Sequence, residues 1–234
     1  MEIKELLPPE NGRLFVTGSS GDGKSTLIRR LDQCIPPDEF VIAFDSKGEW
    51  PVRPRFGKST IPWRRLPRGI PLSQVTPGHY VYRTTYPDTA DGNVEKIIRW
   101  AIKRKHVTLI FDEINNFSHG GFTMPIVSKA LREGRSKFVR IIAGSQFPVK
   151  VAEEVVSQAT MAIVFIILNP NHRRRLADTY HPGLMKEPQG KYSFWLWRKS
   201  EPHTLIHIKQ AEFKDRRFFD QSDQEKGKGR KRGS

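Results

Sequence analysis

Residues 18–25 read Gly18-Ser-Ser-Gly-Asp-Gly-Lys24-Ser25, between an apolar segment at Arg13–Thr17 and an amphipathic segment at Ser25–Asp32. The apolar segment has the length of a buried strand, and the amphipathic segment has helical spacing. A glycine-rich turn between a strand and a helix start points a row of backbone N–H groups at one anion. The run therefore predicts a phosphate-binding loop. A chance glycine-rich turn is the alternative.

The residue types in this loop have separate chemical reasons. Glycines permit backbone angles and a close approach that a Cβ would block. Lys24 would reach the β- and γ-phosphates of ATP, and the Ser25 hydroxyl would ligate Mg²⁺. The predicted nucleotide-binding residues are Gly18, Ser19, Ser20, Gly21, Asp22, Gly23, Lys24, Ser25 and Thr26.

Short apolar runs alternate with helical patterns along most of the chain. Strands are expected at 13–17, 40–45, 79–83, 107–112, 139–143 and 161–168, and helices at 25–32, 93–105, 124–134 (closed by Gly134), 149–158 and 172–180. Strands separated by helices predict an α/β fold with a mostly parallel central sheet flanked by helices. The segments 192–197 and 203–209 predict a C-terminal antiparallel hairpin. The prolines between 47 and 78 exclude a long helix or a central strand there.

A second acidic motif follows the expected strand at 107–112. Asp112 would hold Mg²⁺ at the carboxyl edge of the sheet, and Glu113 would act as the general base toward an attacking water. Such edges are where folds of this class bind ligands. An ordinary pair of carboxylates at a strand end is the alternative. A glutamate directly after the metal-binding aspartate favours hydrolysis over a small-molecule kinase.

Two further groups complete the predicted site. Gln146 follows the strand at 139–143, where its amide would contact both the γ-phosphate and the lytic water. A turn glutamine before proline is its alternative. Arg135, with Arg132 in reserve, is the candidate arginine finger supplied to a neighbouring subunit. Solvated arginines at a helix end are the alternative for these two.

Four segments, taken together and in order, resemble the FtsK–HerA superfamily of P-loop DNA-pumping ATPases. They are Gly18–Ser25, Asp45–Glu49, Phe111–Glu113 with Leu131–Arg135, and Gly144–Pro148. Ser46 stands where the family usually has proline, and Ser145 where it usually has threonine. The resemblance spans residues 12–170, and it implies a RecA-like (ASCE) P-loop NTPase that uses ATP and Mg²⁺.

Within that superfamily the compact chain looks most like the small genome-packaging ATPases of tectivirus-like, membrane-containing double-jelly-roll viruses. This likeness implies a homo-oligomeric ring, a hexamer, that drives double-stranded DNA into a preformed capsid. It also implies contacts with the capsid vertex or internal-membrane proteins, and a place in the host cytoplasm and at the virion packaging vertex. The sequence shows neither a signal peptide nor an apolar run long enough to span a membrane.

The charge balance favours a polyanionic partner. Lys and Arg number 40 against 25 Asp and Glu, a formal net charge of +15, and such a surplus is typical of nucleic-acid binding. Three basic stretches are candidates for contacts to DNA phosphates, and each one alone could be only a solvated surface. They are 53–68 (Arg53, Arg55, Lys58, Arg64, Arg65 and Arg68, with Phe56 and Trp63), His172-Arg173-Arg174-Arg175, and the tail from Lys226 to Arg232.

Two domain-level expectations follow. Residues 1–220 should form a single P-loop ATPase domain, and residues 221–234 a basic, disordered tail. The single cysteine, Cys34, excludes an internal disulfide, and the histidines lack metal-ligand spacing.

Two functional alternatives remain open beside the packaging motor. One is a DNA-pumping ATPase of plasmid transfer or partition, and the other is an assembly protein that binds nucleotide without pumping.

Overall fold

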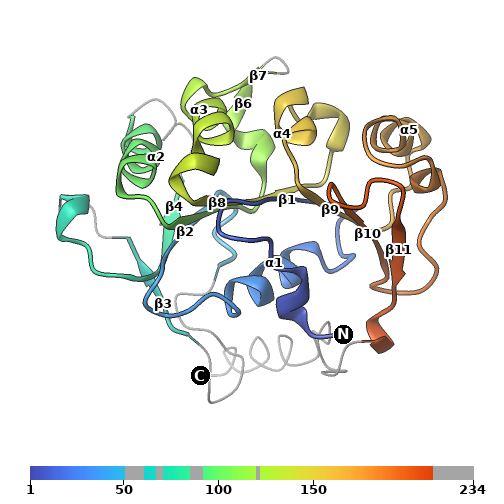
Figure 1. Cartoon of the computed structure of the whole chain (residues 1–234), viewed down its shortest axis with the longest axis horizontal. Helices are drawn as coiled ribbons and strands as arrows, with labels where there is room; N and C mark the ends of the chain where they lie inside the picture. The colour runs from blue at the N-terminus through green and yellow to red at the C-terminus, as the bar shows by residue number, and fades with distance from the viewer. Residues whose placement is uncertain (51–60, 67–70, 85–91, 120–121, 213–234) are drawn as a thin grey trace, which may run out of the picture.

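The computed structural model describes residues 1–50, 61–66, 71–84, 92–119 and 122–212. Its centre is a nine-stranded sheet with the order β11-β10-β9-β1-β8-β5-β2-β4-β3 (Figure 1). The strands from β9 to β3 run parallel, and β10 pairs antiparallel with β9 and β11. The expected mostly parallel sheet with a C-terminal hairpin is confirmed. The strands are β1 (Arg13–Thr17), β2 (Phe40–Asp45), β3 (Trp63–Arg65), β4 (Gly78–Arg83), β5 (Val107–Phe111), β8 (Val139–Ser145), β9 (Met161–Val164), β10 (Phe194–Arg198) and β11 (Leu205–Ile208).

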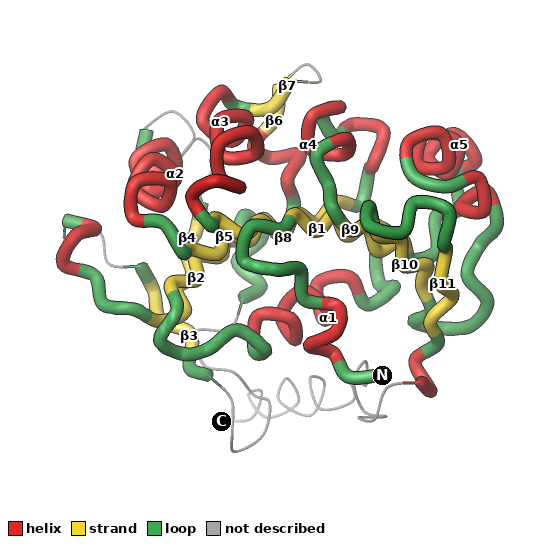
Figure 2. The backbone as a smooth tube through the Cα atoms, viewed as in Figure 1, coloured by secondary structure: helices red, strands yellow, loops and turns green. Residues whose placement is uncertain are grey.

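Helices cover both faces of this sheet. Four of them lie on one face and α1 lies on the other, so that the strands form a continuous middle layer (Figures 1 and 2). The helices are α1 (Lys24–Asp32), α2 (Asn93–Arg104), α3 (Pro125–Glu133), α4 (Glu153–Ser157) and α5 (Pro170–Thr179). A small separate hairpin, β6 (Ser118–His119) with β7 (Phe122–Thr123), follows β5.

The core has two halves, one on each side of the sheet. In β1, Leu14 and Val16 pack in the cluster that contains Leu27 and Leu31 of α1, while Phe15 packs in the cluster on the opposite face. All five residues of β1 are buried, which explains why its three central residues, Leu14, Phe15 and Val16, are apolar without alternation. The strand is thereby fixed in the middle of the sheet, and the loop that follows it is held on a rigid base.

The register of the parallel strands aligns the predicted motifs. Thr17, the residue before the phosphate loop, pairs with Ser145, the residue before Gln146. Phe111, the residue before Asp112, pairs with Ala143 on one side and Phe44 on the other. The motifs that follow β1, β2, β5 and β8 therefore meet at one edge of the sheet, its carboxyl edge.

Some element boundaries differ from the expected ones. The strand expected at 161–168 ends at Val164, because β1 ends at Thr17 and the phosphate loop offers no straight neighbour beyond it. The helix expected at 149–158 is a 3₁₀ turn, η5 (Pro148–Lys150), followed by the short α4.

The end of α3 agrees with the prediction. The helix ends at Glu133, and Gly134, with a φ of −59°, is the residue that closes it. The chain continues as a 3₁₀ turn, η4 (Gly134–Lys137), and Phe138 with φ 53° is the left-handed residue that ends it.

Several of the predicted features lie in segments that the structure does not describe. The tail at 221–234 and the domain boundary before it lie outside the described residues, as do Arg53, Arg55, Phe56, Lys58 and Arg68. Within the described part of the chain, no helix is long and apolar enough to cross a bilayer. The segment around the prolines contributes β3, an edge strand, as the sequence allows.

Candidate nucleotide site

The loop after β1 has the backbone shape that its glycines predict. A Cβ on Gly18 would lie 2.5 Å from the Cβ of Phe165, so that no larger residue fits between β1 and the chain after β9. Gly21 and Gly23 have φ values of 88° and 95°, a left-handed region that glycine adopts without strain. Gly23 is the residue that precedes the first turn of α1. The loop therefore wraps toward the amino end of a helix.

The other predicted nucleotide ligands lie on this loop and the first turn of α1. Ser20 is exposed, whereas Ser19, Ser25 and Thr26 are half-buried. The pKa of the Asp22 carboxyl is raised, chiefly by burial. The first N–H groups of a helix lack partners within the helix, and the helix dipole favours negative charge there. The geometry fits the binding of phosphate groups.

Lys24 is buried, with 4% of its surface exposed. Burial lowers the pKa of its ammonium group, while the charges of Asp112 and Glu113 oppose that shift. A buried ammonium is costly without an anionic partner. Lys24 is the first residue of α1, directly after Gly23, where its ammonium group suits contact with a bound phosphate.

Asp112 directly follows β5 and is buried, with 2% exposed. Both of its carboxylate oxygens are buried without a hydrogen-bond partner among the described residues. The neighbouring Gly144 has no room for a side chain, since a Cβ would lie 2.5 Å from the Asp112 carbonyl oxygen and 2.9 Å from Cδ1 of Ile28. Strands β5 and β8 thus approach closely where the site lies.

The residues present fit a magnesium ion. Mg²⁺ takes oxygen ligands, one or two from protein and others from phosphates and water. The orphaned Asp112 carboxylate and the Ser25 hydroxyl are of that kind. No group of three or more His, Cys, Asp or Glu side chains within the described residues could hold a metal by itself. Such a site would be completed by the nucleotide.

Glu113 is held by contacts on both carboxylate oxygens. Asn115 Nδ2 donates to Oε1 at 3.1 Å, and the backbone N–H of Gln146 donates to Oε2 at 3.3 Å. The Nζ of Lys47 lies 3.9 Å from Oε2. Burial raises the pKa of the Glu113 carboxyl, and Lys47 is the main opposing influence. A carboxylate with a raised pKa is suited to accept a proton from water near neutral pH.

Gln146 lies at the tip of β8 and is half-buried. Its backbone contacts Glu113, so the sheet edge brings the second and third motifs together. Among the described residues its side-chain amide has no hydrogen-bond partner, and its role as a sensor stays a prediction. Asn115 also donates to Ser145 Oγ at 2.9 Å, and Ser145 Oγ accepts from Phe147 N at 3.0 Å.

The two finger candidates do not lie in this site. Arg135 is exposed on η4, which leads into the beginning of β8. β8 has 7 residues, so Arg135 lies about 20 Å along the strand from Gln146. Arg132 is exposed on α3 and pairs with Glu154 at 3.7 Å. Neither arginine reaches the phosphate loop of its own chain.

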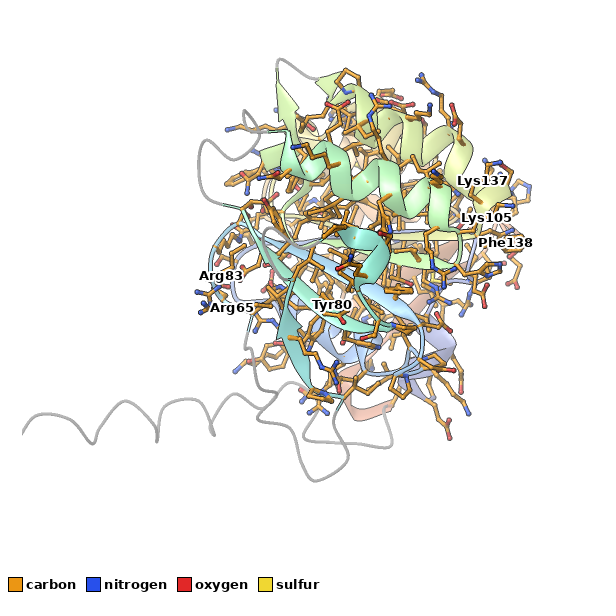
Figure 3. All side chains as sticks on the ribbon, turned by 90° about the vertical axis from the view of Figure 1, so that its left-hand side faces the viewer. Arg65, Tyr80, Arg83, Lys105, Lys137 and Phe138 are labelled. Carbon is orange, nitrogen blue, oxygen red and sulfur yellow. The ribbon has the colours of Figure 1, made fainter. Side chains whose placement is uncertain are left out.

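The basic surfaces are divided between the two edges of the sheet. Figure 3 shows Arg65 and Arg83 together at one edge and Lys105, Lys137 and Phe138 at the other. Arg65 ends β3, and its neighbour Arg64 is also exposed. Trp63 is buried against Trp50, with ring centroids 4.4 Å apart. It is therefore a core residue and not a platform for bases.

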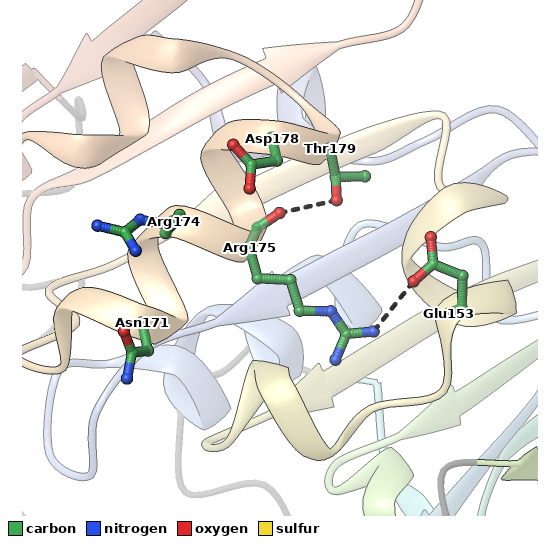
Figure 4. A pocket seen from close by; sticks show the side chains of 6 residues that line it. All are labelled: Glu153, Asn171, Arg174, Arg175, Asp178 and Thr179. Atoms are coloured by element: carbon green, nitrogen blue, oxygen red, sulfur yellow. Dashed lines mark hydrogen bonds and ion pairs between the residues drawn. The ribbon is translucent and has the colours of Figure 1, made fainter.

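The arginines of α5 are not equivalent. Arg175 donates to the carbonyl oxygens of Pro148 and Val151, each at 2.8 Å, and lies 3.6 Å from Glu153 (Figure 4). Arg173 donates to the Ile167 carbonyl oxygen and pairs with Glu187. Arg174 is exposed. Of these three, Arg174 is the one that the fold leaves to solvent.

Two residues of the site carry no assignment from the sequence. Lys47 lies within the Asp45–Glu49 segment, which matched a family motif without a role for the lysine. Asn115 comes two residues after Glu113 and ties it to Ser145. The sequence signal that could have identified Lys47 and Asn115 is that both are polar residues next to a motif. Their contacts depend on the order of the strands in the sheet, which the spacing of residues in the sequence does not reveal.

Several solved structures have a fold similar to that of this chain. The B204 DNA-packaging ATPase of Sulfolobus turreted icosahedral virus matches with a TM-score of 0.64 and 19% identity over 87% of this chain and 98% of that one. The B204 genome-packaging NTPase of Sulfolobus turreted icosahedral virus 2, in complex with AMPPCP, matches with a TM-score of 0.64 and 18% identity over 86% and 98%. The chain has the fold of the P-loop ATPases.

A third similar structure is a conjugation coupling protein. The pCW3 conjugation coupling protein TcpA, with ATPγS, matches with a TM-score of 0.56 and 13% identity over 85% of this chain and 60% of that one. No family model and no curated protein matches the sequence. The resemblance to FtsK–HerA-type ATPases is thus confirmed at the level of the fold.

Proposed function

We propose that the chain hydrolyses ATP to translocate double-stranded DNA, and that it packages a viral genome into a preformed capsid. The observation that carries the hydrolytic part is the buried group at the carboxyl edge. There Lys24 and the unpartnered carboxylate of Asp112 face a loop shaped for phosphates, with Glu113 beside them. The structural similarity to proteins described as genome-packaging ATPases supports the packaging part.

Each residue has a distinct task in this proposal. The loop Gly18–Ser25 and Lys24 bind the phosphates, and Ser25 with Asp112 holds Mg²⁺. The ion would neutralise charge on the phosphates and polarise them. Glu113 orients the attacking water and takes its proton. Gln146, whose backbone already contacts Glu113, senses whether the terminal phosphate is present.

The position of Arg135 supports a ring. Arg135 is exposed at the amino edge of the sheet and does not reach the phosphate loop of its own chain, so a catalytic role would require a neighbouring subunit. We place Arg135 of one subunit at the nucleotide of the next in a homo-oligomer, a hexamer by resemblance, with Arg132 as the reserve. A finger in trans would supply the cation that the transferred phosphoryl group needs.

DNA would be held through its phosphates without base reading. Arg64, Arg65 and Arg174 are the exposed arginines among the candidates that the structure describes. Such contacts give sequence-independent, salt-sensitive binding. The capsid vertex or an internal-membrane protein would anchor the ring at the packaging site, in the host cytoplasm and later in the virion.

The test of the proposed function is ATP hydrolysis with and without duplex DNA. Wild type should hydrolyse ATP faster when DNA is added, and Glu113→Gln should be silent in both conditions while still binding ATP. Equal rates with and without DNA would overturn the motor and favour a nucleotide switch. A further outcome is that DNA stimulates hydrolysis in a protein that supports relaxase-dependent transfer of a plasmid and does not fill capsids with DNA. That result would establish the plasmid-transfer alternative, which the match to TcpA suggests.

The trans finger has its own test by subunit mixing. Arg135→Ala and Glu113→Gln should each be inactive alone, because one lacks the finger and the other the base. Mixed together they should regain activity, since the Arg135→Ala site receives the finger of a Glu113→Gln neighbour. Lys137→Ala, from the same 3₁₀ turn, is the matched control and should stay active. Full hydrolysis by Arg135→Ala alone would contradict this role.

A further inference from the structure

The turn after β2 places Lys47 against the catalytic glutamate. Lys47 Nζ lies 3.9 Å from Glu113 Oε2, with 30% of the lysine side chain and 9% of the glutamate side chain exposed. This separation exceeds hydrogen-bond length, and among the described residues the ammonium makes no hydrogen bond. An ammonium has three N–H donors. Within the described part of the chain, all three can therefore turn to a ligand without breaking a hydrogen bond, and the ion pair with Glu113 is the contact that would be given up.

The turn that carries Lys47 is held from several sides. Asp45 Oδ1 accepts from Glu49 N at 3.1 Å, and Asp45 Oδ2 accepts from Trp50 N at 3.2 Å. Asn116 Nδ2 donates to Ser46 Oγ at 2.6 Å. The bonds fix the backbone on both sides of Lys47 while its side chain remains partly exposed. A long side chain on a fixed turn can change partners without a change in the fold.

Lys47 and Lys24 lie close to the carboxyl groups of the site. Lys24 and Lys47 face the carboxyl groups of Asp112 and Glu113, and Lys47 lies close enough to lower the pKa of Lys24. The carboxyl group of Asp22 is a third acid close to Lys24. A triphosphate with Mg²⁺ brings further negative charge into this corner, and the terminal phosphate is a stronger partner for an ammonium than one carboxylate.

We propose that Lys47 recognises the terminal phosphate of the bound nucleotide and exchanges Glu113 for it. This role rests on the proposed function, because it requires a nucleoside triphosphate in the loop. With a triphosphate bound, Lys47 contacts the phosphate and Glu113 is free to accept a proton from water. With a diphosphate bound, the terminal group is missing and Lys47 stays with Glu113. The lysine therefore discriminates ATP from ADP.

The test compares the binding of ATPγS and ADP to wild type, Lys47→Ala and Lys47→Arg. Lys47→Ala should weaken ATPγS binding by about 10- to 100-fold, the range of a charge-assisted hydrogen bond. Its affinity for ADP should change by no more than about twofold, as the lost contact is to the terminal phosphate. Lys47→Arg should restore most of the loss, because it retains the charge and the donors.

The control and the contrary results separate this role from the proposed function. Lys129→Ala removes a lysine that pairs with Glu133 on α3 at 3.8 Å, and it should leave both affinities unchanged. Equal losses for ATPγS and ADP in Lys47→Ala, or no loss for either, would overturn the role of Lys47 alone. A wild type that binds neither nucleotide would overturn the proposed function, and this role with it.

Discussion

The two edges of the sheet differ in how their buried charged side chains are partnered. At the amino edge, Asp32 and His79 meet at 2.9 Å with their side chains fully buried, and Arg140 donates to the Pro8 carbonyl oxygen and Thr108 Oγ1, each at 3.0 Å. At the carboxyl edge, both oxygens of Asp112 lack a partner among the described residues. The Asp32–His79 ion pair and the hydrogen bonds of Arg140 indicate a structural role, whereas the unpartnered carboxylate of Asp112 indicates a place for a ligand.

The largest expected effect separates activity from stability at the carboxyl edge. Asp112→Asn should lower ATP hydrolysis by at least about 100-fold, because the residue that holds Mg²⁺ is lost. Its free energy of unfolding should stay the same or rise by about 1–2 kcal/mol, since an uncompensated buried charge is removed. Hydrolysis assays and urea unfolding measure the two effects. A strong loss of stability would show that Asp112 is a structural residue.

The amino edge should behave in the opposite way. Asp32→Asn removes one partner of the buried pair with His79 and should lower the free energy of unfolding by about 3–5 kcal/mol. Activity per folded molecule should be unchanged, because neither residue lies at the phosphate loop. Urea unfolding and active-site titration check this expectation. A variant as stable as wild type would contradict a structural role for the pair.

Gly144 links stability to activity at the carboxyl edge, because it lies where β8 passes Asp112. Gly144→Ala would set a Cβ 2.5 Å from the Asp112 carbonyl oxygen. The resulting shift should cost about 1–3 kcal/mol of stability and also lower activity, since Asp112 must move. Unfolding and hydrolysis measured on the same preparation test this. Loss of stability with normal hydrolysis would place the strain away from the site.

The buried pair at the amino edge should make the stability depend on pH. The carboxylate of Asp32 raises the pKa of His79 against the effect of burial, and burial raises the pKa of Asp32. Both groups bind protons more tightly when folded, so stability is lost as pH rises through their folded pKa values. Urea unfolding from pH 6 to 9 should show falling stability. The double variant Asp32→Asn, His79→Gln should flatten the slope, and an unchanged slope would assign it elsewhere.

The smallest effect concerns the exposed arginines near the carboxyl edge. Arg64→Ala and Arg65→Ala should each reduce the slope of log affinity for random duplex DNA against log salt by about one, as one phosphate contact is lost. Arg175→Ala is the contrast, because its guanidinium already contacts backbone carbonyls. Binding titrations at several salt concentrations measure the slopes. A flat salt response of wild type would contradict phosphate binding.

The sequence predicted the parts of the fold that depend on local pattern. The strand, glycine-rich turn and helix at residues 13–32 could be assigned because apolar spacing and glycine chemistry act over a few residues. The pairing of Asp32 with His79, and of Lys47 with Glu113, could not, because each joins segments that meet only through the strand order. The run of arginines in α5 suggested DNA contacts, yet two of the three serve the fold.

The most direct test is a crystal structure with Mg²⁺ and a non-hydrolysable ATP analogue. The phosphates should lie within the loop Gly18–Ser25 with Lys24 against them. The ion should lie about 2.1 Å from Ser25 Oγ, on the side of the Asp112 carboxylate. Nucleotide bound elsewhere, or Asp112 turned away from the ion, would contradict the account.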